Sequence, residues 1–237
     1  MKSIISAKRP KVFLLENVKN LCSHDKGRTF SVIKDTLENL GYRMYYKVID
    51  AIKWVPQHRE RIFIVGFRKP DANQNWDVTD FSFDDVAIPK TPVDLSEILE
   101  PQVPEKYTLG PGTWRTLERH KAHHESKGQG FGYGLIKPPF KGKTTRTISA
   151  RYHKDGAEIL INQEGKRPRR LTPLECSRLM GFPKWCQSFY TRNNDSKQPV
   201  SDTQAYRQFG NSVAVPVVDA IAKTIIDALA RNNADLG

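Results

Sequence analysis

The alternation of strand and helix patterns in the N-terminal part of this 237-residue chain constrains its fold most. Residues 11–15 form a short apolar run that ends at a glutamate, as in a buried strand. Apolar side chains recur at helical spacing over residues 28–40, and a glycine stop follows. Residues 42–50 and 61–67 have strand patterns. We therefore predict an α/β fold, in which helices are layered on part of a sheet.

A second, more irregular region follows these strands. Residues 70–112 are rich in Pro, Asp and Gly, and they contain one short predicted helix at 94–99. A polar helix is predicted over 113–125. Gly and Lys turns separate short predicted strands between residues 130 and 162. The pattern indicates a smaller, β-rich region.

Helix signals return near the C-terminus. Thr172 is a good N-cap, Pro173 suits the first helical position, and Glu175 completes a Thr-x-x-Glu capping box. A final helix is predicted over 215–231, where apolar residues have core spacing. A Gly-Asn turn at 210–211 precedes it.

The charge of the chain points to a polyanionic partner. Its formal net charge is +12 and its pI is near 9.6. Basic residues gather between Lys137 and Arg170, and glycines and aromatics are interleaved directly upstream. Phosphate neutralisation by such a stretch predicts a salt-dependent affinity for nucleic acid. A solvated basic face is the alternative.

Other classes of protein and site are disfavoured. No apolar run approaches the length of a membrane-spanning helix, and the N-terminal apolar stretch is too short for a signal peptide, so we expect a cytosolic protein. Cys22, Cys176 and Cys186 are few, odd in number and widely spaced, which favours neither a disulfide framework nor zinc. None has an evident base beside it, so we expect all three to be non-catalytic. The three histidines of residues 120–124 favour a solvated helix over a metal site.

Three further features have residues suited to binding a ligand or taking part in a reaction. Glu16 follows the first strand, where open α/β sheets place ligands. A buried carboxyl group there can hold a substrate N–H, or stay protonated and donate a hydrogen bond. Arg59 and Arg61 alternate in extended chain and so point to one side, which suits a carbonyl oxygen or a phosphate. The glycine of segment 210–212 lets the backbone pass close to a ligand. A turn cap, surface charge and an ordinary turn are the respective alternatives.

The order of these features and the strings around them resemble the DNA (cytosine-5) methyltransferase family. The resemblance extends from Lys11 to the C-terminus and is greatest to Dcm-like bacterial members. The matching segments are Glu-Asn-Val-Lys-Asn-Leu (16–21), Pro-Gln-His-Arg-Glu-Arg-Ile (56–62), Gly-Phe-Gly-Tyr-Gly-Leu (130–135), Thr-Arg-Thr-Ile-Ser-Ala-Arg-Tyr (145–152), Arg-Leu-Thr-Pro-Leu-Glu-Cys-Ser-Arg-Leu-Met-Gly-Phe (170–182) and Gln-Ala-Tyr-Arg-Gln-Phe-Gly-Asn-Ser-Val (204–213).

The resemblance implies a partial Rossmann-like, S-adenosylmethionine-dependent methyltransferase sheet with a small target-recognition domain. It implies methyl transfer from S-adenosylmethionine to C5 of a cytosine flipped out of double-stranded DNA. A thiolate adds to C6 in this family and pushes electrons toward N3, where an acid is needed. The resemblance gives that role to Glu16, and it implies that Arg59 and Arg61 help hold the flipped base. The family's cofactor-pocket turn falls on Asn211, Ser212 and Val213.

The resemblance also divides the chain. Residues 1–69 would belong to the catalytic domain, 70–168 would form the target-recognition domain, and 169–237 would return to the catalytic domain. The glycine-rich run 128–134 and the segment 144–152 are similar to Dcm-like enzymes of the CC-x-GG site class, and this resemblance implies a target of that class. The expected DNA-binding residues are Gly132, Tyr133, Lys141, Lys143, Arg146 and Arg151.

The chain departs from the family pattern in one respect that decides its activity. The Pro-Cys nucleophile, the Gly-rich cofactor turn and the acidic ribose-binding position all precede the Glu-Asn-Val segment in the family, and none occurs here. We therefore expect the chain alone to be inactive, as a truncated product or as half of a split enzyme that pairs with a second polypeptide. Exposed strand edges are expected in that case. A non-catalytic DNA-recognition fragment and an RNA-directed member of the same fold are the alternatives.

Overall fold

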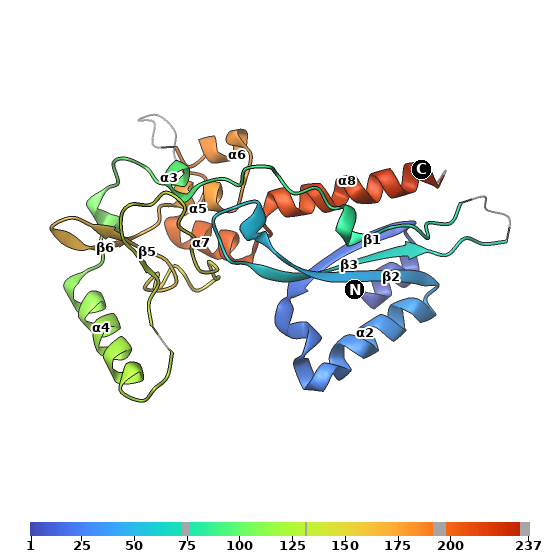
Figure 1. Ribbon diagram of the computed structural model, residues 1–237, viewed down its shortest axis with the longest axis horizontal. Helices are drawn as coiled ribbons and strands as arrows, with labels where there is room; N and C mark the ends of the chain where they lie inside the picture. The colour runs from blue at the N-terminus through green and yellow to red at the C-terminus, as the bar shows by residue number, and fades with distance from the viewer. Residues whose placement is uncertain (73–75, 131, 192–197, 233–237) are drawn as a thin grey trace. The chain divides into compact units, whose positions relative to one another are not determined.

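The computed structural model describes residues 1–72, 76–130, 132–191 and 198–232 (Figure 1). Phe131, part of the glycine-rich segment of the resemblance, lies outside the described residues. The chain forms two compact units. The first unit comprises Met1–Asp50, Glu60–Ile88 and Val218–Gly237, and the second comprises Ala51–Arg59 and Pro89–Val217.

A three-stranded sheet is the centre of the first unit. Its strands are β1 (Val12–Val18), β2 (Tyr42–Asp50) and β3 (Glu60–Arg68), in the order β1-β3-β2 with both outer strands antiparallel to β3. All three predicted strands are confirmed. β1 extends beyond its predicted end, so that Glu16 lies inside the strand, opposite Phe63.

Helices cover both faces of this sheet (Figure 1). The predicted helix α2 (Arg28–Asn39) covers one face, together with Ile5 from the unpredicted α1 (Lys2–Lys8). On the other face lies α8 (Val215–Arg231), which confirms the predicted last helix and belongs to this unit from Val218 on. The α/β fold class is therefore confirmed for this part of the chain.

Strand alternation sorts the side chains of β3 between these two faces. Ile62 and Ile64 belong to the cluster on the α2 face, while Phe67 meets the rings of Tyr45 and Phe81 at centroid distances of 5.9 and 5.4 Å. Both sets are almost fully buried, as expected for a central strand with cover on each side. The outer edge of β1 pairs with no strand among the residues that the structure describes.

Gly66 of β3 makes room for an aromatic ring from the neighbouring strand. A Cβ at this position would lie 2.2 Å from Cζ of Phe13, its register partner on β1. We expect Gly66→Ala to destabilise the protein by about 1–3 kcal/mol, because the buried ring must move. Phe13→Leu should cost less in the Gly66→Ala background than in the wild type, since the clash is then relieved. Urea denaturation measures both effects.

A matched glycine serves as the control for this prediction. A Cβ at Gly112, in the first turn of a helix, would meet no atom within 4 Å. Gly112→Ala should be neutral or stabilising by up to about 1 kcal/mol. Equal unfolding midpoints for the two glycine variants would contradict the steric explanation.

The second unit contains short helices around a small sheet. Its elements are α3 (Leu95–Ile98), α4 (Pro111–Glu125), β4 (Leu135–Ile136), β5 (Leu160–Gln163), β6 (Lys166–Arg170), α5 (Pro173–Leu179), α6 (Lys184–Ser188) and α7 (Asp202–Asn211). Single turns of 3-10 helix in the chain are Lys19–Cys22, His24–Gly27, Ala51–Lys53, Phe83–Asp85 and Glu105–Tyr107. In the sheet β4 pairs parallel with β5, and β5 pairs antiparallel with β6.

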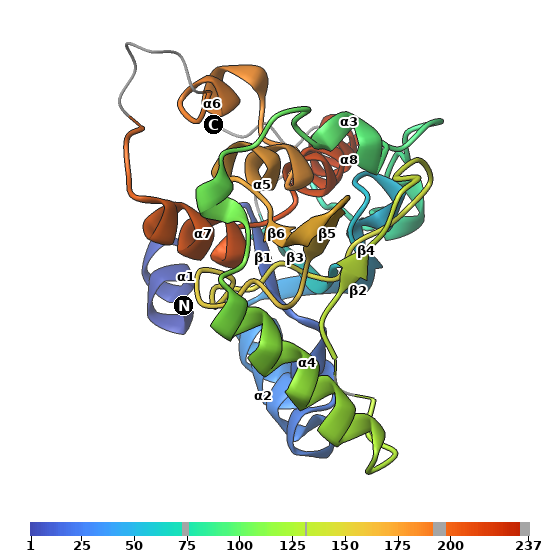
Figure 2. The same ribbon diagram turned by 90° about the vertical axis from the view of Figure 1, so that its left-hand side faces the viewer.

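Predictions for this unit succeeded where a helix signal was strong. The helices α3, α4 and α5 are confirmed, and capping boxes begin α3 and α5. Only β4 and part of β5 occur in the stretch 130–162 where several strands were predicted, because its Gly, Pro and Lys turns interrupt any ladder. The helix α4 packs through Trp114 and Leu117 and then extends away from the small sheet (Figure 2).

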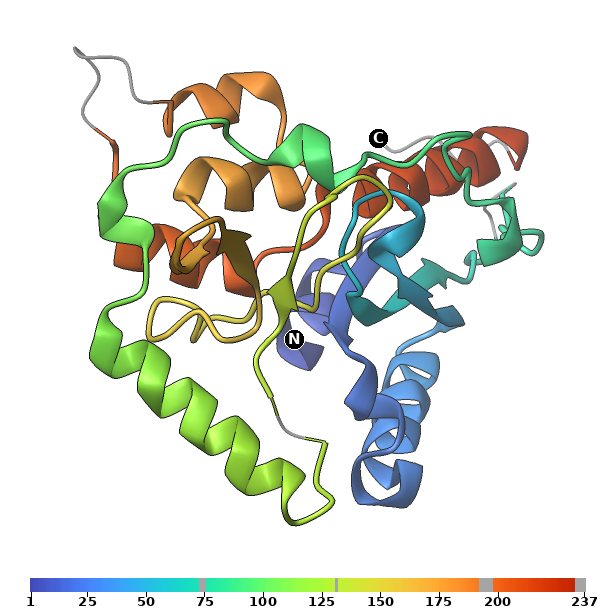
Figure 3. The ribbon, with the colours of Figure 1, turned by 60° about the vertical axis from the view of Figure 1, so that its left-hand side comes forward.

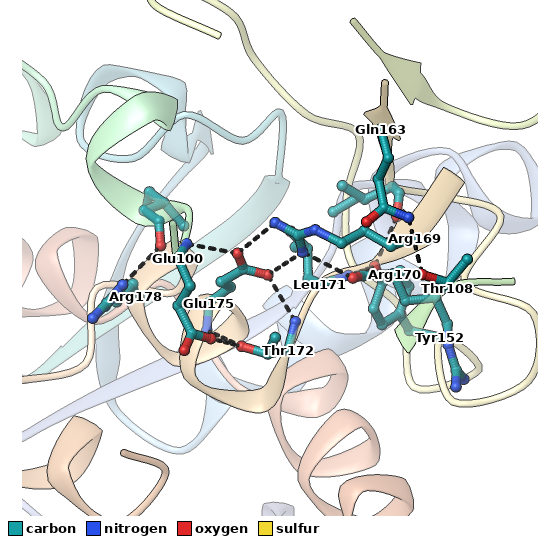
Figure 4. Close-up of polar contacts among 12 residues, drawn as sticks. Glu100, Thr108, Tyr152, Gln163, Arg169, Arg170, Leu171, Thr172, Glu175 and Arg178 are labelled. Carbon is teal, nitrogen blue, oxygen red and sulfur yellow. Dashed lines mark hydrogen bonds and ion pairs between the residues drawn. The ribbon is translucent and has the colours of Figure 1, made fainter. Parts of the chain in front are cut away.

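A buried polar network fixes the start of α5 (Figure 4). Glu175 is fully buried, and its Oε1 accepts hydrogen bonds from Glu100 N (2.8 Å) and Arg169 Nη2 (2.9 Å). Its Oε2 accepts from Arg169 Nη1 (2.7 Å) and Thr172 N (2.8 Å). The Thr172 hydroxyl donates to the Glu100 carboxylate. The residues of the predicted capping box therefore also connect α5 with β6 and with the segment after α3 through hydrogen bonds.

The boundaries of the two compact units differ from the boundaries of the three predicted regions. Residues 169–217 lie in the same compact unit as residues 89–168. The division at 69 and 168 stays a prediction about function rather than a description of packing.

Candidate functional site

Two of the predicted catalytic residues meet on neighbouring strands of the first unit. Val18 of β1 opposes Arg61 of β3, so Glu16, two residues earlier, projects diagonally from the same face. Arg61 Nε lies 2.9 Å from Glu16 Oε1. The side chains are 26% exposed for Glu16 and 16% for Arg61, which shields the ion pair but leaves it reachable. An ion pair of this kind fixes the direction of a carboxylate.

Arg59 is engaged elsewhere, within the second unit. Its side chain is buried, at 2% exposure. Nη1 donates to the carbonyl oxygen of Ile148 (3.0 Å), and Nη2 donates to the carbonyls of Gly210 (3.1 Å) and Ser212 (2.5 Å). Sequence alternation placed Arg59 beside Arg61, but it gave no sign of these three main-chain acceptors.

The residues before Arg59 lie beside the segment 145–148 (Figure 3), and Gln57 forms a β-bridge with Thr145. His58 N donates to the Thr145 carbonyl (2.9 Å), and Ile148 N donates to Gln57 Oε1 (2.9 Å). Gln57 is fully buried. Residues of the Pro-Gln-His-Arg segment (56–59) therefore form several hydrogen bonds with residues 145–148, and these bonds fix the position of that segment.

The predicted cofactor-binding residues lie where α7 ends. Gly210 and Asn211 are the last residues of that helix rather than a turn before α8, and Ser212 is its C-cap. Gly210 does not adopt a left-handed conformation; it is needed for close approach, because a Cβ would lie 2.2 Å from the backbone carbon of Ser149. Asn211 is exposed, and Val213 is half-buried.

Three of the six predicted DNA-binding residues line one cavity of about 390 Å³ in the second unit. They are Gly132, Arg146 and Arg151, and Arg146 Nη1 donates to the Gly132 carbonyl. The full lining is Gly130, Gly132, Arg146, Arg151, Lys154, Asp155, Ala157 and Glu158. Lys154 belongs to the basic stretch predicted to bind nucleic acid, three residues beyond Arg151, but it was not among the six predicted DNA-binding residues.

The other predicted DNA-binding residues lie outside that lining. Tyr133 packs against Trp114 at a centroid distance of 4.8 Å, and Lys121 Nζ lies 5.1 Å from its ring centroid. Lys141 and Lys143 are exposed on either side of Gly142. Their roles stay predictions.

Burial argues against a cysteine nucleophile in the second unit. Cys176 is fully buried, and this burial raises the pKa of its thiol well above the ordinary value. Burial also raises the pKa of Cys186. A raised pKa disfavours the thiolate, which is the nucleophilic form.

We also searched the described residues for metal-ligating clusters and for membrane-spanning helices. Among the described residues no group of three or more His, Cys, Asp or Glu is arranged to hold a metal ion. No helix in that part of the chain combines the length and apolarity that a membrane crossing requires.

Comparison with proteins of known sequence identifies relatives that match most of this chain. The family described as C-5 cytosine-specific DNA methylase matches residues 1–227. The chain is 52% identical over 227 residues to the type II methyltransferase M.SsoII of Shigella sonnei, covering 95% of this chain and 55% of that protein. It is 46% identical over 249 residues to the DNA-cytosine methyltransferase of Escherichia coli K12, covering 94% and 51%. The chain spans about half the length of these relatives.

Solved structures support the fold. The Dnmt2 methyltransferase of S. pombe superposes with a TM-score of 0.68 at 18% identity, covering 93% of this chain and 68% of that one. The Entamoeba histolytica methyltransferase EhMeth gives a TM-score of 0.65 at 19% identity, covering 93% and 63%. The methyltransferase α/β fold is thereby confirmed. Together with the family match and the bacterial relatives, it establishes that this chain belongs to the C-5 cytosine-specific DNA methylase family.

Proposed function

We propose that this chain is the base-holding and DNA-recognition part of a DNA (cytosine-5) methyltransferase, which methylates C5 of a cytosine flipped out of a specific duplex site. The Glu16–Arg61 ion pair carries the proposal. When a thiolate adds to C6 of cytosine, electron density moves toward N3. In this proposal Glu16 holds the N3 and N4 edge of the base, while Arg61 fixes the carboxylate and donates a hydrogen bond to O2.

S-adenosylmethionine is the methyl donor in this proposal, and it supplies an electrophilic methyl group when bound. The end of α7 fits one wall of its site. Ser212 is held through its carbonyl by Arg59, while the amide of Asn211 is exposed. A carbonyl held in this way lets the following residues present a preformed edge to a ligand.

The nucleophile comes from outside this sequence in our proposal. The sequence has no Pro-Cys, and the thiol of Cys176 is buried. A second polypeptide or segment would supply the thiolate and the Gly-rich cofactor turn. It would also cover the outer edge of β1.

DNA recognition is assigned to the cavity that contains Arg146, Arg151 and Lys154. Its cations and the net charge of +12 suit the DNA backbone, and its backbone and carboxylate groups suit base edges. The proposed place of action is the bacterial cytoplasm, where such DNA lies.

Removal of Lys154 should show how this surface binds DNA. We expect Lys154→Ala to weaken binding about equally for all duplex sequences, and to lower the slope of log K against log salt by about 1, as for a lost phosphate contact. Fluorescence anisotropy between about 50 and 200 mM salt measures both quantities. Lys223→Ala removes a positive charge from an exposed position of α8 in the first unit, outside residues 70–168, and should leave the slope unchanged. Identical slopes for the two variants would argue against Lys154 as a phosphate contact.

Methyl transfer tests the proposed function directly. Labelled S-adenosylmethionine and duplex DNA are incubated with the chain alone, and then with the chain mixed with the N-terminal half of the Shigella sonnei relative. We expect transfer only in the mixture. Transfer by the chain alone would overturn the assignment of the nucleophile. Salt-sensitive DNA binding without transfer in the mixture would favour the second candidate, a non-catalytic DNA-recognition fragment, which the cavity supports without any thiolate.

A further inference from the structure

Arg59 joins two segments to which the proposed function gives different tasks. Its Nη1 donates to the carbonyl of Ile148, which lies in the chain between the cavity residues Arg146 and Arg151. Its Nη2 donates to the carbonyls of Gly210 and Ser212. At 2% exposure this side chain does not face a DNA phosphate. A guanidinium suits such a place, because its planar fork directs several donors at fixed angles, which an ammonium does not.

A second contact joins the same two segments without any charge. A Cβ at Gly210 would lie 2.2 Å from Ser149 C, 2.3 Å from Ser149 O and 2.3 Å from Ala150 N. The end of α7 therefore packs directly on the peptide between Ser149 and Ala150. These close contacts are to backbone atoms, so a larger residue at position 210 can be accommodated only if one segment shifts.

Such a shift would reach the recognition cavity within one or two residues. Arg151 N donates to Ser149 Oγ (3.1 Å), and that hydroxyl donates to the carboxylate of Glu158. Arg151 and Glu158 both line the cavity. The backbone that Arg59 and Gly210 hold is thus the backbone that directs Arg151.

We propose that Arg59 is a positioning residue for DNA recognition. Together with Gly210 it holds the segment 148–151 and the end of α7 (210–212) in one arrangement, so that Arg151 is placed to contact DNA only when the end of α7 has its native geometry. The proposal rests on the proposed function. It also links S-adenosylmethionine and DNA, the two ligands of that function. A ligand that stabilises the end of α7 stabilises the placement of Arg151, and such coupling is reciprocal.

The DNA affinity of the whole chain tests this role. The probe is a fluorescein-labelled duplex with a central CC-x-GG site, and the variants are Arg59→Lys, Gly210→Ala, Arg151→Ala and the two double variants that contain Arg151→Ala. We expect Arg59→Lys and Gly210→Ala each to weaken binding about fivefold, and to lower the salt slope by about 1, as Arg151→Ala does. Neither should weaken binding further when Arg151 is already replaced.

Controls separate positioning from a loss of folded protein. Partial unfolding lowers the fraction of chain that binds DNA in a titration with excess probe, but it leaves the salt slope of the folded fraction unchanged. Lys223→Ala, at an exposed position of α8 outside residues 70–168, should combine independently with every variant.

The possible failures are distinguishable. Wild-type slope and affinity in Arg59→Lys and Gly210→Ala would overturn the positioning role, as would losses that multiply with that of Arg151→Ala. An Arg151→Ala variant that binds like the wild type would overturn it as well. A wild-type chain that fails to bind duplex DNA at low salt would instead refute the proposed function.

Discussion

Replacement of Glu175 by glutamine should destabilise the second unit by about 3–5 kcal/mol, although the two side chains have nearly the same shape. Both carboxylate oxygens of Glu175 accept two hydrogen bonds, and all four come from N–H donors (Figure 4). An amide has one oxygen and one NH₂ group, so either orientation turns N–H bonds toward N–H donors. The substitution also leaves the Arg169 guanidinium, 6% exposed, without its carboxylate.

Urea denaturation followed by circular dichroism measures this cost, and α3 provides the control. Glu97 occupies the same capping-box position there, accepts from Asp94 N (3.1 Å) and is exposed. Glu97→Gln should cost about 1 kcal/mol or less. Similar losses in the two variants would show that burial and the Arg169 pair add nothing. Replacing Arg169 and Glu175 together by apolar residues should cost less than either single change, because no buried charge is then left unpaired.

The elements predicted well from the sequence are those specified by local signals. The Asp94 and Thr172 caps, the alternation of 42–50 and the apolar stripe of 215–231 each determine a segment through its own residues. The helix α7 was missed because its polar composition hides the apolar triad of Ala205, Tyr206 and Phe209, whose burial comes from tertiary packing.

The candidate site shows the same limit more clearly. The pairing of Glu16 with Arg61 follows from strand register, which the sequence alone does not give. The acceptors of Arg59 lie 89 to 153 residues away in the chain. Two alternating arginines therefore looked equivalent, although one is held by main-chain carbonyls and the other by a carboxylate. The role of each arginine depends on its hydrogen-bond partners, and these partners are distant in the sequence.

Methyl transfer by the mixture with an N-terminal half should fall by about 100-fold or more in Glu16→Gln, the usual range for loss of a group that manages a proton in the transition state. Glutamine keeps the size of the side chain and one oxygen for Arg61, so the strand pair should remain folded. It no longer provides a carboxyl group whose proton can be transferred to N3 as the thiolate adds to C6. The loss should appear in kcat more than in the KM for DNA, since the interaction strengthens in the transition state.

Glu60→Gln is the matched control, because Glu60 is a neighbouring carboxylate on β3 that pairs with Lys19 (2.7 Å) and is 47% exposed. It should retain nearly full transfer, which separates the role of Glu16 from a general effect of negative charge at this end of the sheet. Arg61→Lys should give an intermediate loss, because it keeps the charge but not the planar fork that directs the carboxylate. If Glu16→Gln and Glu60→Gln transferred methyl groups equally well, the carboxylate of Glu16 would be a structural partner of Arg61 and the acid at N3 would have to be another group.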